Sequence, residues 1–131
     1  MSTVINGSSP SITFSDSTTQ STAGLTGSTS QLCQAWVNFN GSGGASIRAS
    51  YNVSSVTRNG TGDYTVTYTN ALTDANYSVV GLIQGIAGVN GAFLQLWDAG
   101  TPVTTTTTRF QAKLPTSANT DTSYVCVSVF R

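Results

Sequence analysis

Apolar and polar residues alternate along most of the chain with a period of two. The clearest case is "QAWVNFN" at 34–40, where Ala35, Val37 and Phe39 point to one side and Trp36 points to the other. A period of two is the pattern of a β-strand with one buried face. It predicts that the first three residues face a core. Trp36 is left on the polar side, where something else must cover it.

Short alternating segments recur along the rest of the chain, separated by connections that contain Gly, Asn and Ser. Together with the first, they predict strands at 34–40, 45–56, 63–69, 77–86, 92–97, 105–113 and 123–130. Asn-Gly pairs stand in three connections, and this pair is the strongest short signal for a hairpin. No segment has helical periodicity. The pattern predicts an all-β fold, an antiparallel β-sandwich of about seven or eight strands.

Two further strands place apolar residues outside a single core face. "YSVVGLIQGI" at 77–86 is apolar on both sides, which is typical of a central strand or of a strand at an interface. In "AFLQLWD", Leu94 and Leu96 share one face while Trp97 lies on the other. Together with Trp36, these strands indicate a second buried surface besides the core.

The two outward tryptophans have two interpretations. An exposed Trp can stack on a sugar ring, and Trp is also enriched where subunits meet. We assign Trp36, in mid-strand, to a subunit interface together with Asn38. Trp97 stands beside the loop "DAGTP" and is the better candidate for a ligand contact.

Residues 1–30 differ from the rest of the chain. They are rich in Gly, Ser and Thr, and only Ile12 and Phe14 form a short apolar alternation. Such a segment cannot bury enough apolar surface to fold alone. We expect an extended N-terminal arm over 1–30 that orders only against something else, followed by a β-sandwich domain over 31–131.

Charge and targeting signals exclude several classes of function. Only 8% of the residues are charged, the formal net charge is +0, and the five Lys and Arg residues are scattered. Nothing therefore favours a nucleic-acid partner. No apolar run reaches the length of a membrane span. The start, "MSTVINGSSPSITF", has neither the basic nor the apolar region of a secretory signal, so we expect synthesis in the cytoplasm.

The side chains that usually carry catalysis are few. The chain has no His, which removes His-activated nucleophiles and His metal ligands. Each of its five acids is an aspartate in an apparent turn or in the arm, where Asp bends and caps the backbone. No two of them share a strand face at short spacing, as paired catalytic carboxylates would. We expect no enzyme activity, no metal site and no cofactor.

Cys33 and Cys126 flank the first and last predicted strands. A disulfide between them would join the two ends of the domain. Two reduced thiols are the expectation for a protein made in the cytoplasm.

Two stretches of the chain resemble one group of proteins. "CQAWVNFNGSGGASIRASYNVSSVTRNGTGDYTVTYTNALTDANYSVV" and the closing "YVCVSVFR" are similar to the distal domain of bacteriophage tail fibres and tailspikes, especially in phages of cyanobacteria and other aquatic bacteria. The upstream "ITFSDSTTQSTA" resembles the "ITFxDGTxQxTA" segment that commonly precedes such domains, with Ser17 where they usually have Gly. The resemblance covers residues 11–23 and 32–131. It implies a β-sandwich that assembles as a homotrimer, often with loops presented to a host surface, and no catalytic residues.

Within that resemblance, the short segment before the sandwich favours a form without a fibre shaft. A small trimeric sandwich with a short arm is the format of capsid decoration (cement) proteins, whose weak contacts gain avidity by repetition over a shell. We therefore expect a homotrimer on the outer capsid surface of a virion, bound to the major capsid protein. The alternative is the receptor-binding tip of a tail fibre or tailspike. A second alternative is a free-standing lectin that binds a host glycan.

The arm supplies Ile12 and Phe14, which we expect to anchor the protein on the capsid and to contribute to the trimer interface. Alternate loops of an antiparallel sandwich collect at opposite ends, so loops 40–44, 70–76 and 98–104 should share one end with the C-terminus. The candidate contacts with a host surface or glycan are expected at that end: Asn40, Asp74, Trp97 and Asp98.

Overall fold

The computed structural model describes residues 4–6, 11–13, 15–17, 19–20, 32–85 and 91–131. The chain divides into two compact units, Met1–Gln31 and Leu32–Arg131. Every regular element among the described residues is a β-strand, which confirms the prediction of an all-β fold. That part of the chain holds no helix long and apolar enough to cross a membrane.

The first unit contains a small antiparallel sheet where the sequence predicted an extended arm. Strand β1 (Val4–Asn6) pairs with β2 (Ser11–Thr13), and β2 pairs with β3 (Thr19–Gln20). Ser17 lies between β2 and β3 with φ 68°, a left-handed conformation that Gly adopts most easily. A tight turn at this position lets β3 fold back on β2.

The two arm residues proposed as a capsid anchor differ in what the structure describes. Ile12 lies on β2, opposite Ile5 of β1 and Gln20 of β3. Phe14 lies outside the described residues.

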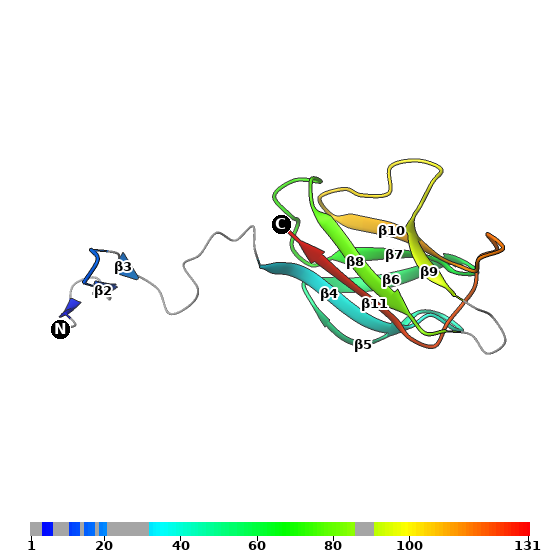
Figure 1. Ribbon diagram of the computed structural model, residues 1–131, viewed down its shortest axis with the longest axis horizontal. Coiled ribbons are helices and arrows are strands. Elements are labelled where there is room, and N and C mark those ends of the chain that lie inside the picture. The colour runs from blue at the N-terminus through cyan, green and yellow to red at the C-terminus, as the bar shows by residue number, and fades with distance from the viewer. Residues whose placement is uncertain (1–3, 7–10, 14, 18, 21–31, 86–90) are drawn as a thin grey trace. The chain divides into compact units, whose positions relative to one another are not determined.

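The second unit is a β-sandwich of two four-stranded antiparallel sheets (Figure 1). One sheet has the order β5-β4-β11-β8 and consists of β4 (Cys33–Asn40), β5 (Ser46–Tyr51), β8 (Ser78–Ile83) and β11 (Val125–Phe130). The other has the order β6-β7-β10-β9 and consists of β6 (Val53–Gly60), β7 (Asp63–Tyr68), β9 (Phe93–Leu96) and β10 (Thr107–Lys113). The predicted antiparallel sandwich is confirmed.

The core lies between the sheets and uses the inward positions that the alternation predicted. Ala35, Val37 and Phe39 on β4 are all almost completely buried. From the facing sheet, the rings of Tyr64 and Phe110 pack against Phe39 at centroid separations of 5.1 and 6.3 Å. Burial of each large apolar side chain contributes roughly 1.5–3 kcal/mol, so contacts of this kind hold the two sheets together.

The predicted strand at 45–56 is wrong, because the chain forms two strands there. β5 belongs to one sheet and β6 to the other, and Asn52 between them has φ 52°. The Asn52 amide donates to the carbonyl oxygens of Gln34 and Asn70, at 3.1 and 3.2 Å, and accepts from the Asn70 N–H at 2.8 Å. Asn tolerates the left-handed region better than most residues. One residue therefore reverses the chain and moves it to the other sheet.

This additional reversal changes which loops lie at which end of the sandwich. At one end of β4, Phe39 pairs with Val125, and at the other end Cys33 pairs with Phe130. Loop 40–44 and the C-terminus are therefore at opposite ends. Loop 70–76 lies at the C-terminal end, because its Asp74 forms an ion pair with the C-terminal residue, Arg131. The prediction that loops 40–44 and 70–76 share an end is wrong.

Two of the three Asn-Gly signals do mark hairpins, although neighbouring residues make the turns. β4 and β5 are joined by a loop with positive φ at three successive residues, 43–45. β6 and β7 are joined by Thr61 and Gly62, and Gly62 has φ 61°. The third signal lies in the connection 84–92 between β8 and β9, which belong to different sheets. The hairpin predicted there is wrong.

Cys33 and Cys126 are both free thiols. Cys33 pairs with Phe130 at one end of β4, whereas Cys126 pairs with Asn38 near the other end. A strand rises about 3.3 Å per residue, so this offset exceeds the roughly 7 Å between Cα atoms that a disulfide can bridge. The expectation of two reduced thiols is confirmed.

Candidate interaction surface

Trp36 lies on the outer face of the β5-β4-β11-β8 sheet. Strand pairing aligns one residue from each strand in a row across this face: Tyr51, Trp36, Ser128 and Val80. A second row lies beside it: Ala49, Asn38, Cys126 and Leu82. Paired residues project to the same side of a sheet, so each row is continuous across the strands. Trp36 and Asn38, the two strand residues predicted for an interface, therefore lie in adjacent rows.

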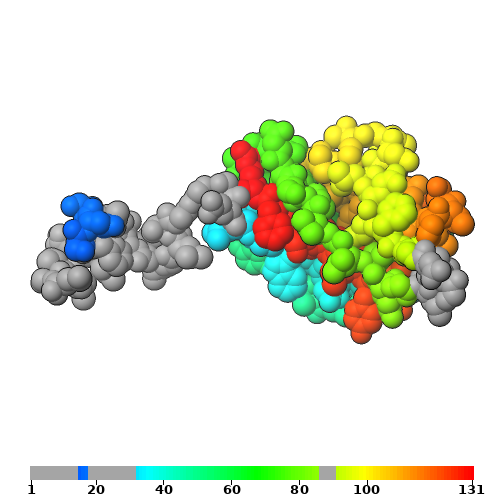
Figure 2. Space-filling view, viewed as in Figure 1, coloured from blue at the N-terminus to red at the C-terminus, as the bar shows by residue number. Residues whose placement is uncertain are grey.

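Large apolar side chains on this face are exposed. Leu82 is 75% exposed, Val80 55% and Trp36 38%. Tyr124, directly before β11, and Phe130, at its end, are 50% and 39% exposed. We call these five residues the apolar face. Figure 2 shows β4, β11 and β8 side by side at the surface, with no other described segment over them.

The outer face of the other sheet is polar across β6, β7 and β10, and Phe93 is exposed on its edge strand, β9. One row across it consists of Ser55, Thr67 and Thr107. The next row consists of Thr57, Thr65 and Arg109. Threonine suits a hydrated strand face, because its branched side chain favours the strand and its hydroxyl group bonds to water. Antiparallel sheets ordinarily present a polar face to solvent, and in this sandwich only one of the two outer faces does so.

The apolar face explains the pattern of 77–86. Val79 and Ile83 pack against the core, while Val80 and Leu82 project outward. β8 is an edge strand, so the interpretation of this segment as a central strand is wrong. Of the two interpretations that the sequence allowed, the one that remains is a strand at an interface.

Trp97 lies on the other sheet and is partly covered by its own chain. The guanidinium carbon of Arg109 is 3.9 Å from the centre of the Trp97 ring. Arg109 also donates to both carboxylate oxygens of Asp63, at 2.9 and 2.8 Å. These hydrogen bonds hold the pKa of Asp63 below its usual range. The two tryptophans thus belong to different surfaces, and Arg109 occupies one ring face of Trp97.

The other candidate host contacts are divided between the two ends of the sandwich. Asp74 lies at the C-terminal end, where it is ion-paired with Arg131. Trp97 and Asp98 directly follow β9 at that same end. Asn40 is the last residue of β4 and lies at the opposite end. The structure therefore groups three of these four residues and separates Asn40 from them.

Asp121 accepts hydrogen bonds from three partners, and these bonds are structural. Its carboxylate accepts from Arg58, from the Tyr64 hydroxyl at 2.7 Å and from the Gly62 N–H at 2.8 Å. Burial acts to raise the pKa of Asp121, but these three donors outweigh it and the pKa is lowered. The contacts tie loop 114–124 to the β6–β7 hairpin. No three His, Cys, Asp or Glu side chains within the described ranges are grouped as metal ligands.

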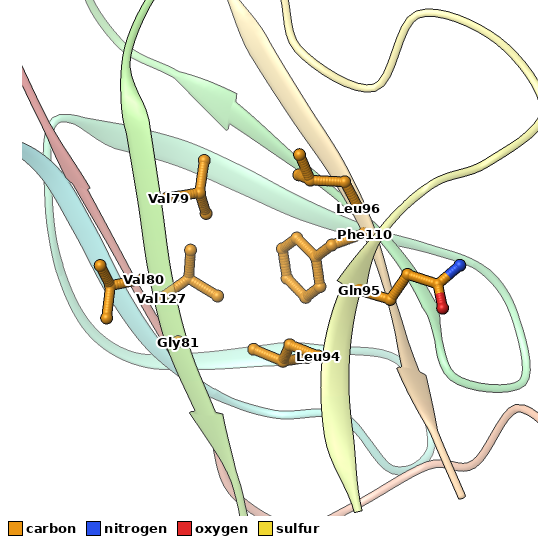
Figure 3. Close-up of a pocket in the computed structure, with 8 residues that line it drawn as sticks. All are labelled: Val79, Val80, Gly81, Leu94, Gln95, Leu96, Phe110 and Val127. Atoms are coloured by element: carbon orange, nitrogen blue, oxygen red, sulfur yellow. The ribbon is translucent and has the colours of Figure 1, made fainter. Parts of the chain in front are cut away.

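An apolar cleft of about 320 Å³ separates the edges of β8 and β9 (Figure 3). Val79, Leu94 and Phe110 point into it, whereas Val80 and Gln95 point away from it. The cleft lies between the two sheets, so it continues the core to the surface along this side of the sandwich.

A comparison of the chain with protein families, curated proteins and solved structures finds no match. The function is therefore argued from the surfaces themselves. Among the described residues, the apolar face is the surface whose composition departs furthest from that of a hydrated sheet. Sequence patterning identified its Trp36 and the apolar 77–86 segment. It missed Tyr124 and Phe130, which the alternation of the last strand places outward, opposite Val125, Val127 and Val129.

Proposed function

We propose that the protein is a non-catalytic structural protein of a bacteriophage particle, a capsid decoration protein that assembles as a homotrimer through the apolar face. The observation that carries the self-association is the contrast between the two outer faces of the sandwich. One is covered by Thr and Ser on β6, β7 and β10 and, among its described residues, exposes a large apolar side chain only at Phe93 on its edge strand, whereas the other exposes Trp36, Val80 and Leu82. The link to a bacteriophage particle, and the trimeric state, rest on the resemblance of the sequence to fibre domains.

The size of the apolar face suits an interface between copies. If a large apolar side chain offers roughly 200 Å², the exposed fractions of the five residues leave on the order of 500 Å² of apolar surface. A specific interface buries about 800 Å² per partner, and roughly two thirds of that area is apolar in homo-oligomers. Each subunit of a closed trimer contributes to two interfaces. The apolar face supplies the apolar share of one of them, and neighbouring polar residues such as Asn38 and Ser128 supply its rim.

Light scattering tests the self-association. We expect a mass of three times the 13.6 kDa chain at micromolar concentration. Leu82→Asp should lower that mass to one chain, because it places a charge at the most exposed residue of the apolar face. The matched control is Phe93→Asp, since Phe93 is 46% exposed on β9 of the other sheet. A single-chain mass for the unaltered protein, or equal masses for both variants, would contradict the proposal.

Binding to particles tests the capsid assignment separately. We propose that the first unit makes the capsid contact, because it is a unit separate from the sandwich and carries the apolar pair Ile12 and Phe14. Deletion of residues 1–24 should abolish binding to virions and leave the circular dichroism of the sandwich unchanged. Gold labelling should decorate the capsid. Labelling of the tail alone would replace the capsid assignment with that of a fibre tip.

A further inference from the structure

A polar hollow of about 350 Å³ lies at the end of the sandwich where β5 ends and the chain leaves β7. Its walls come from Gln34 on β4, Tyr51 and Asn52 at the β5–β6 reversal, and the loop 69–73. The volume falls at the lower end of the range for small-molecule sites. The hollow is therefore large enough for a small ligand. It shares no residue with the apolar face, but its Tyr51 pairs with Trp36 and so lies at the border of that face.

The walls of the hollow are held in place before any ligand arrives. The Asn52 carbonyl oxygen accepts from the Thr69 N–H at 3.2 Å, in addition to the three bonds of the Asn52 side chain to Gln34 and Asn70. On the other side of the loop, the Leu72 N–H donates to the Thr105 carbonyl oxygen at 2.8 Å, and the Leu72 side chain is buried. A site fixed in this way loses little conformational entropy when it binds.

The polar residues that line the hollow carry an aromatic ring, hydroxyls and amides. Tyr51 is 58% exposed, and Thr69, Asn70 and Thr73 are exposed around it. No charged side chain contributes to the lining. A flat apolar ring beside neutral hydrogen-bonding groups matches a sugar, which has an apolar face of C–H groups and a rim of hydroxyls. We propose that this hollow binds a neutral saccharide, with Tyr51 as the stacking platform and Asn70 and Thr73 as hydrogen-bonding partners.

Two other places on the molecule fit a saccharide less well. Trp97 has a larger ring, but Arg109 already lies over one of its faces. The cleft between β8 and β9 is lined mainly by apolar side chains such as Val79, Leu94 and Phe110. A sugar in that cleft would lose its bonds to water without replacement, which is costly. The polar hollow combines the exposed aromatic ring of Tyr51 with side chains that can form hydrogen bonds to a sugar.

Titration with simple sugars, followed by amide chemical shifts in NMR, tests the proposal. The probes are the methyl glycosides of glucose, galactose, mannose and N-acetylglucosamine at millimolar concentration. At least one of them should shift the amide signals of Tyr51, Asn70 and Thr73. Tyr51→Ala should weaken that binding at least tenfold, and Asn70→Ala should weaken it as well. Phe93→Ala is the matched control, a 46% exposed aromatic residue outside both the hollow and the apolar face, and it should bind as the unaltered protein does.

Three results would overturn the saccharide site. The first is the absence of shifts with all of the probes, and the second is a set of shifts centred on Trp97. The third is binding that Tyr51→Ala leaves unchanged. Light scattering of Tyr51→Ala separates this site from the proposed trimer, because the mass should not change. A loss of mass in that variant would assign Tyr51 to the subunit interface and remove it from a ligand site.

Discussion

The reversal at Asn52 is the feature of this fold whose energetic contribution is easiest to measure. Asn52 has φ 52°, and its side chain makes three hydrogen bonds, two to Asn70 and one to Gln34. Asn52→Ala removes these bonds and also forces a residue with a Cβ and no polar side chain into the left-handed region. Asn52→Gly removes the same bonds but adopts that conformation without strain.

The structure sets the expected size of both effects. Two of the three bonds are exposed and one is partly buried, so each should contribute about 0.5–1 kcal/mol, the lower part of the usual range. The left-handed conformation costs a residue such as Ala about 1–2 kcal/mol. Asn52→Ala should therefore lower the free energy of unfolding by about 3 kcal/mol. Asn52→Gly should lower it by about 2 kcal/mol, because its gain at φ is partly offset by its greater freedom in the unfolded chain.

Urea unfolding at one fixed protein concentration, followed by circular dichroism, measures these differences. Asn70→Ala serves as the control, since the exposed Asn70 bonds to Asn52 through its backbone, and it should stay within about 0.5 kcal/mol of the unaltered protein. The reasoning fails if Asn52→Ala also stays within that limit. It fails in part if Asn52→Gly lowers the free energy of unfolding as much as Asn52→Ala does, because the left-handed conformation would then cost Ala nothing.

Two further predictions concern pH and redox state. The folded-state pKa values of Asp63 and Asp121 are lowered, so their contribution to stability is complete above an aspartate's ordinary pKa of about 4 and is lost as pH falls further. Urea unfolding should give a lower free energy of unfolding at pH 2 to 4 than at pH 7. Asp121→Asn should make that difference smaller. A free energy of unfolding that rises on acidification would contradict this prediction. Cys33 and Cys126 should both react with a thiol reagent after denaturation without reductant. A lack of reaction would indicate a disulfide and would contradict the register of β4 and β11, which holds the two residues too far apart.

The strands were easier to predict from the sequence than their arrangement was. Alternation in "QAWVNFN" identified the buried set on β4, because a period of two depends only on local geometry. The break at Asn52 was missed, since Asn is compatible with a left-handed residue but does not require one. Because this reversal was missed, every later loop was predicted at the wrong end of the sandwich relative to loop 40–44. Local patterns do not record which sheet a strand joins, so the connection 84–92 was also misread as a hairpin.

The surface was predictable to a similar extent. The sequence predicted that Trp36 and Trp97 both point away from the core. The structure confirms this for Trp36, which is 38% exposed, and it places the half-buried ring of Trp97 against Arg109. The sequence could not show that they lie on different sheets, because that depends on pairing between distant segments. Arg109 is separated from Trp97 by a full loop, and their contact follows from the pairing of β9 with β10.

The two sheets are joined differently on the two sides of the sandwich, and this difference predicts on which side they separate first. On one side, Asn52 alone connects β5 to β6, the edge strands of the two sheets. On the other side, β8 and β9 are linked through residues 84–92 and separated by the apolar cleft. The two sheets are thus joined by a single residue on the first side and by a longer connection beside the cleft on the second. Transient separation of the sheets should begin on the second side, so amide hydrogens of β8 and β9 should exchange with solvent sooner than those of β4 and β7.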